Sequence, residues 1–81
     1  DNYPNPFNPV TTIKYEISER TFITLKVYDN LGKVVASLQK GYQSAGTYEV
    51  SFDGKNLSSG VYFYKFSAGD NVETRKMIML K

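Results

Sequence analysis

Hydrophobic and polar residues alternate along most of the chain in short runs. Ile13, Tyr15 and Ile17, for example, fall on one side of an extended chain, and the polar residues between them fall on the other. Six such runs predict strands, over residues 12–18, 21–28, 34–38, 47–52, 61–67 and 72–81. No stretch has the three-to-four-residue spacing of an amphipathic helix. Six or seven strands at a spacing of about 12 residues are typical of a small antiparallel sandwich, so we predict an all-β fold.

Residues that favour chain reversal separate the runs. Turns are expected at residues 29–32, 53–54 and 69–71, where Asp, Asn and Gly gather. Residues 40–46 contain two glycines and no periodicity, which predicts a loop. Leu57 is a lone hydrophobic residue in a polar stretch, and we expect it to reach the core from a loop.

The run 61–67 is the most hydrophobic of the six. Tyr62 and Phe66 fall on one side of it and Val61 and Phe63 on the other, so both sides are apolar. A strand with two apolar sides is typical of the middle of a sheet, and we expect this one to be central.

The first ten residues differ in composition from the rest. Prolines at positions 4, 6 and 9 fix the backbone angle φ and cannot donate hydrogen bonds, which predicts a stiff, polyproline-like lead-in. We expect the ring of Phe7 to close one end of the sandwich. The chain is therefore interpreted as one domain, residues 1–81, with a lead-in over 1–10 and a β-sandwich over 11–81.

Composition excludes several classes of function. The chain has no His, Cys or Trp, so it lacks imidazole acid–base groups, thiol nucleophiles and disulfides, and no metal or cofactor is expected. Ten basic and eight acidic residues give a net charge of +2, too balanced for a nucleic-acid-binding surface. No apolar run approaches the length of about 20 residues that spans a bilayer. The sequence begins with Asp1 rather than with Met, and its start resembles the middle of a longer protein.

Two sets of residues offer candidate chemistry. Asp29, Asp53 and Asp70 fall in predicted turns, where we expect them to accept backbone hydrogen bonds rather than form a catalytic pair or a calcium site. Tyr42, in the predicted loop, is the best candidate for an exposed ring that stacks on a sugar; most other tyrosines are expected in the core or between strands.

The end of the chain is basic around an apolar strand. Arg75, Lys76 and Lys81 are compatible with two interpretations, and the residues alone leave both open. Charged side chains protect an exposed sheet edge from aggregation. A terminal strand of this kind also suits recognition by another protein, by strand addition or by pockets.

Five blocks of sequence, in order, are similar to one known family. The blocks are Asn2-Tyr3-Pro4-Asn5-Pro6-Phe7-Asn8-Pro9 with Thr11-Thr12-Ile13-Lys14-Tyr15, Val27-Tyr28-Asp29-Asn30-Leu31-Gly32-Lys33-Val34-Val35, Ala45-Gly46-Thr47-Tyr48, Ser59-Gly60-Val61-Tyr62-Phe63-Tyr64-Lys65, and Thr74-Arg75-Lys76-Met77-Ile78-Met79-Leu80-Lys81. Together they resemble the type A C-terminal sorting domains of the type IX secretion system. The resemblance implies an immunoglobulin-like antiparallel β-sandwich of about seven short strands.

The resemblance also implies a function without catalysis. The domain would direct a cargo protein, N-terminal in the same chain, from the periplasm through an outer-membrane translocon to the cell surface or medium of a Bacteroidota-type bacterium. A sortase-like peptidase would then act on it. The recognition residues implied by this resemblance are Gly60, Val61, Tyr62, Arg75, Lys76 and Lys81.

Two other functions stay open at this point. The opening block and the block at Ser59-Gly60-Val61-Tyr62 also resemble the immunoglobulin-like domain of flagellar hook-capping proteins, a structural assembly module. A structural module of this kind serves assembly or adhesion. The third possibility is a carbohydrate-binding accessory domain of a secreted hydrolase, which needs an exposed aromatic platform.

Overall fold

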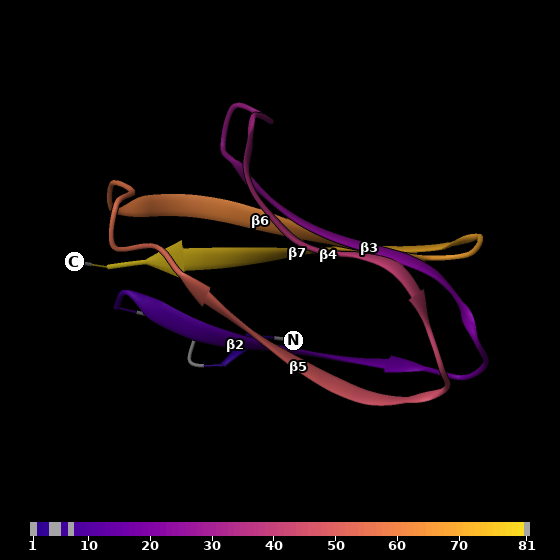
Figure 1. The fold of residues 1–81 in the computed structure, drawn as a ribbon. Helices are drawn as coiled ribbons and strands as arrows, with labels where there is room; N and C mark the ends of the chain where they lie inside the picture. The colour runs from indigo at the N-terminus through magenta and orange to yellow at the C-terminus, as the bar shows by residue number, and fades with distance from the viewer. Residues whose placement is uncertain (1, 4–5, 7, 81) are drawn as a thin grey trace.

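Two antiparallel sheets make up the computed structural model, which describes residues 2–3, 6 and 8–80 (Figure 1). The strands are β1 (Asn2–Tyr3), β2 (Val10–Ile17), β3 (Thr21–Asp29), β4 (Val34–Gln43), β5 (Gly46–Asp53), β6 (Gly60–Ala68) and β7 (Asn71–Met79). One sheet has the order β1-β2-β5 and the other β4-β3-β6-β7. The described residues contain no helix. These findings confirm an all-β antiparallel sandwich of about seven short strands.

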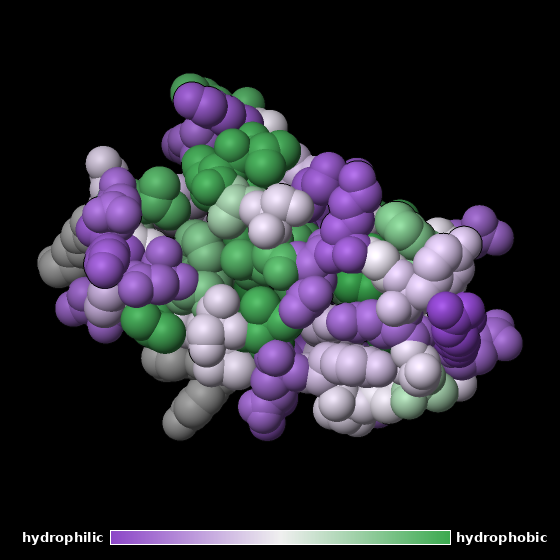
Figure 2. Space-filling view, viewed as in Figure 1, coloured by the Kyte–Doolittle hydropathy of each residue, from purple (hydrophilic) through white to green (hydrophobic). Residues whose placement is uncertain are grey.

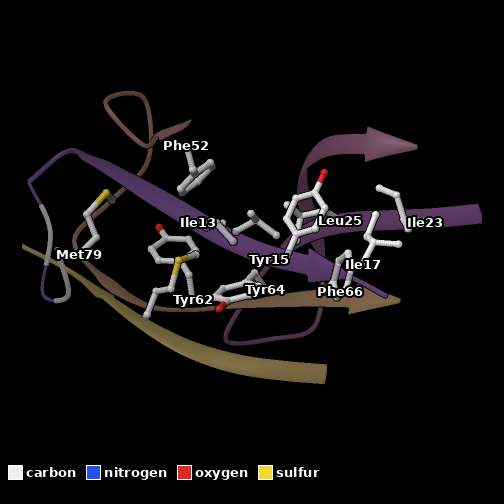
Figure 3. Close-up of a cluster of buried hydrophobic side chains, with 12 residues drawn as sticks. Ile13, Tyr15, Ile17, Ile23, Leu25, Phe52, Tyr62, Tyr64, Phe66 and Met79 are labelled. Atoms are coloured by element: carbon white, nitrogen blue, oxygen red, sulfur yellow. The ribbon is translucent and has the colours of Figure 1, made fainter. Parts of the chain in front are cut away.

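The core lies between the sheets, where the alternating sequence places it. Ile13, Tyr15 and Ile17 of β2 are buried and point toward the strand β6 of the opposite sheet (Figure 3). The ring of Tyr15 lies 4.6 Å from that of Phe66 and also stacks on Tyr48 at 5.3 Å. The other buried hydrophobic side chains are Ile23, Leu25, Val27, Phe52, Tyr62, Tyr64, Met77 and Met79. The two-residue period of a strand therefore predicts the inner faces of β2, β3 and β6.

The position of β6 agrees with its two-sided sequence. It lies between β3 and β7 and pairs with both. Tyr62 and Phe66 are buried on its inner face, whereas Phe63 on the outer face is half-buried. The prediction of a central strand is confirmed.

The loop predicted at residues 40–46 is wrong over its first part, because β4 continues to Gln43. The ladder between β3 and β4 shifts register twice, at Leu38 and at Val35, and each is an extra residue on β4. Such bulges interrupt the alternation of inward and outward side chains, so the sequence pattern of this strand fades before the strand ends.

Turns are found at all three predicted positions, and at two of them an aspartate accepts backbone hydrogen bonds. Asp29 Oδ1 accepts from the backbone N–H groups of Leu31 and Lys33, both at 2.9 Å. Asp53 Oδ1 accepts from the N–H of Lys55 at 3.0 Å. Leu57 packs against the core from the loop that follows, as predicted.

The N-terminal segment contributes to the smaller sheet. Asn2 pairs with Ile13 and Tyr3 with Thr12. Phe7, and with it the predicted closure of the sandwich end, lies outside the described residues. No helix long and apolar enough to cross a bilayer is found in the described part of the chain.

Not all hydrophobic side chains fit between two sheets as small as these. Figure 2 shows one face on which hydrophobic residues gather in the middle, between hydrophilic ends. Across the molecule, Leu31 at 88%, Val72 at 56% and Leu80 at 54% are the apolar aliphatic side chains most open to solvent. Val72 and Leu80 lie near the two ends of β7, so this strand is a candidate for contact with a partner.

Candidate recognition surface

The two recognition stretches suggested by the sequence are register partners. Val61 pairs with Ile78 and Tyr62 with Met77, so the start of β6 lies against the end of β7. Arg75 and Lys76 come one step further along the same ladder, opposite Tyr64 and Phe63. The structure thus brings five of the six predicted residues into one hairpin. Lys81 lies outside the described residues.

These residues divide between the two faces of the sheet. Val61 and Lys76 lie on the outer face, together with Phe63 and Ile78, because alternate residues of paired strands share a side. Val61 is 36% exposed and Lys76 is also exposed. We call these four residues the β6–β7 outer patch. It combines apolar surface with one cationic side chain, a composition suited to protein contact.

Tyr62 points the other way. Only 6% of its surface is exposed, and its ring belongs to the core. Its hydroxyl donates a hydrogen bond to the carbonyl oxygen of Ser58 at 2.6 Å. A partner that docks on the folded sandwich contacts almost none of this side chain. Tyr62 therefore supports the start of β6 from inside the core.

The same hydrogen bond occurs a second time, at the start of β5. The hydroxyl of Tyr48 donates to the carbonyl oxygen of Ser44 at 2.6 Å, again four residues upstream. Such a bond from a tyrosine at a strand start to upstream backbone is a tyrosine corner. Both corners follow the pattern Ser-x-Gly-x-Tyr, a structural sequence signal that is unrelated to any catalytic motif.

The glycine of each corner has a backbone that other residues rarely adopt. Gly46 has φ of 153° and Gly60 has φ of 154°. A side chain at either position would be strained. Gly60 therefore permits the turn that leads into β6.

The strand β7 forms one edge of the four-stranded sheet. It pairs with β6 alone among the described strands. Residues 71–76 are exposed on both faces, so this half of the strand extends beyond the core. Arg75 Nη2 lies 3.6 Å from Glu73 Oε1, with both side chains about half exposed. An ion pair in this setting contributes little to stability, and the exposed edge can accept a further strand.

The second half of β7 is held tightly. Met77 and Met79 are fully buried. The Met79 sulfur lies so close to Gly54 that a Cβ atom added there would be 2.5 Å from it. The N–H of Gly54 in turn donates to the Pro9 carbonyl oxygen at 2.9 Å. The strand end is thereby tied to the β5–β6 loop and to the residue before β2.

A shallow hollow of about 390 Å³ continues the outer face toward the β3–β4 turn. Tyr28, Phe63, Lys65 and Thr74 contribute to its lining, together with residues of the turn. The hollow is thus contiguous with the β6–β7 outer patch through Phe63. The surface presents apolar rings beside lysine side chains.

The residues considered for catalysis or sugar binding have other partners. Asp29 and Asp53 serve turns, as described above. Tyr42 is 65% exposed, as predicted, but its ring meets Phe22 edge-on at 5.2 Å, and the Arg20 guanidinium lies 5.0 Å from the ring centroid. Within the described ranges, no three His, Cys, Asp or Glu side chains are grouped to hold a metal ion.

A family model described as the secretion system C-terminal sorting domain matches residues 1–80. No curated protein and no solved structure gives a match. The family is one of sorting signals and not of catalysts, and it implies a cargo N-terminal to the domain and export to the cell surface or the extracellular space. The match covers almost the entire sandwich, including both strands of the hairpin. The chain belongs to the family of type IX secretion C-terminal sorting domains.

Proposed function

We propose that the folded sandwich, residues 1–81, is an export label that the outer-membrane translocon reads at the β6–β7 hairpin. The carrying observation is that the two stretches implicated by family resemblance are paired in one hairpin, Val61 opposite Ile78 and Tyr62 opposite Met77. The cargo reaches the periplasm first and is then carried outward by virtue of this domain. A sortase-like peptidase supplies the chemistry, and this chain acts as its substrate or as an uncut anchor.

The six residues take different parts in this proposal. Val61 and Lys76 touch the translocon component, because they are exposed on one face. Arg75 adds charge at the edge of the same hairpin. Gly60 and Tyr62 hold the start of β6 in place through the corner. Lys81 extends the basic ending beyond the described strand.

Strand addition at β7 is a second source of affinity. The edge carries backbone N–H and C=O groups that an incoming strand can pair with, and neighbouring side chains then select the partner. Burial of Met77 and Met79 keeps this edge at a constant position on the sandwich.

The proposal is tested with a reporter joined to residues 1–81 in a host that carries the secretion system. Val61→Gln with Lys76→Glu should hold the reporter in the periplasm, whereas Ser51→Glu, on the outer face of the other sheet, should leave export unchanged. Surface substitutions such as these shift stability by about 0.5 kcal/mol or less, and circular dichroism of the purified variants checks that they fold. Export of the double variant at the normal level would refute the assignment of this patch.

The ending offers a separate test. Removal of residues 77–81 should abolish export, because it removes the end of the chain together with two core side chains, Met77 and Met79. A bulky tag placed after Lys81 leaves the core intact and should still impair export if the end of the chain is read. Normal secretion of the tagged protein would show that the end of the chain is not a contact.

A further inference from the structure

A groove of about 790 Å³ opens on the side of the sandwich, between the end of β2 and the β6–β7 turn. Tyr15, Ile17 and Phe66 contribute its apolar floor. Thr21, Ala68 and Val72 also line it. The groove lies on the inner side of the four-stranded sheet, opposite to the face that carries Val61 and Lys76.

Two strand edges border this groove. β1 pairs with β2 only opposite Thr12 and Ile13, so residues 14–17 have no strand on that side among the described residues. The edge of β7 is open in the same sense. Backbone N–H and C=O groups at such edges can bind an extended peptide as an additional strand.

The groove is acidic although the domain is basic overall. Glu16, Glu19, Asp70 and Glu73 line it, which is four of the eight acidic residues of a chain with a net charge of +2. No Lys or Arg is among its lining residues. Arg75 stands at the border, 3.6 Å from Glu73. A concave surface lined by one sign of charge concentrates ligands of the opposite sign.

We propose that this groove binds an extended, basic peptide segment of a partner protein, which adds a strand to β2 along residues 14–17. Side chains of an added strand alternate as those of β2 do. Its inward residues are apolar and cover Tyr15 and Phe66, and its outward residues are Lys or Arg beside Glu16 and Glu19. The site is separate from the β6–β7 outer patch, and peptide binding here does not depend on the role proposed for that patch.

The probe is the peptide Lys-Val-Arg-Ile-Lys-Val-Arg with acetylated and amidated ends, titrated into the 81-residue chain. Two-dimensional amide NMR spectra should show saturable shifts confined to residues 14–19 and 66–73. The same peptide with Pro in place of its central Ile keeps its charge but loses a backbone donor, so its binding should fall at least about fivefold. Equal binding of the two peptides would overturn strand addition.

Charge is tested on the protein side. Glu16→Gln with Glu19→Gln should weaken binding about fivefold, as expected for two exposed ion pairs. Glu49→Gln makes the same type of change on β5, away from the groove, and should have no effect. Shifts outside the groove, or undiminished binding to the double variant, would contradict the proposal.

Discussion

Replacement of Tyr62 by phenylalanine tests whether this residue acts through the fold or by contact. The substitution keeps the buried ring and removes one hydrogen bond, from the hydroxyl to the Ser58 carbonyl oxygen at 2.6 Å. A hydrogen bond of this type contributes about 1 kcal/mol net. In a domain of this size, a loss of 1 kcal/mol lowers the melting temperature by about 4–8 °C. We therefore expect a clear but moderate loss of stability.

Urea titration followed by circular dichroism measures the change. The midpoint should fall while the slope of the unfolding free energy stays constant, because the surface buried on folding is nearly the same. Tyr48→Phe is the matched control: it has the same geometry, but its bond is more exposed, so the loss should be smaller. Export of a reporter at a temperature where Tyr62→Phe is fully folded should be normal. An unchanged midpoint would refute the energetic reasoning, and reduced export of the folded variant would show that the hydroxyl is a contact.

Three further predictions concern the core. Met77→Ala should cost about 2–5 kcal/mol, measured by urea unfolding, because it opens a cavity at a fully buried position; a loss below 1 kcal/mol would contradict the tight packing of the β7 end. Gly54→Ala should destabilise the domain, and Gly54→Ala with Met79→Ala should be less destabilised than the sum of the two single changes, because the added Cβ meets the Met79 sulfur. Burial raises the pKa of Tyr15 and Tyr64 above the usual 10.0, so the folded state keeps these protons longer than the unfolded state. The contribution of the two tyrosines to stability should be constant below pH 10 and be lost as the pH rises through the higher folded values, and Tyr64→Phe should flatten this fall in an unfolding titration repeated at several pH values.

The inner faces of the sandwich follow from the sequence because burial has the same two-residue period as the strand. Ile13, Tyr15 and Ile17 show this most simply, since the residues between them are polar. The alternation also separates Tyr62 from Val61, so that their opposite orientations can be predicted. Neither result depends on contacts between distant parts of the chain.

Other features depend on contacts that no local pattern records. The bulges at Val35 and Leu38 arise from the pairing of β4 with β3. They break the alternation of hydrophobic and polar residues, so the pattern does not predict the second half of β4. The register that places Val61 opposite Ile78 requires both strands of the hairpin. The acidic groove joins residues near position 16 with residues near position 70, and these approach only when the two sheets pack. The two tyrosine corners, by contrast, can be predicted from the sequence, because the Ser-x-Gly-x-Tyr pattern occurs twice.

Site-specific crosslinking during export would identify the surface of the domain that the translocon contacts. The photoreactive residue p-benzoylphenylalanine is introduced at Val61, on the β6–β7 outer patch, or at Ser51, on the exposed outer face of the other sheet, in a reporter joined to the domain. We expect illumination to link position 61, and not position 51, to an outer-membrane component of the secretion system. Efficient export without a crosslink from position 61, or with the crosslink only from position 51, would contradict this expectation.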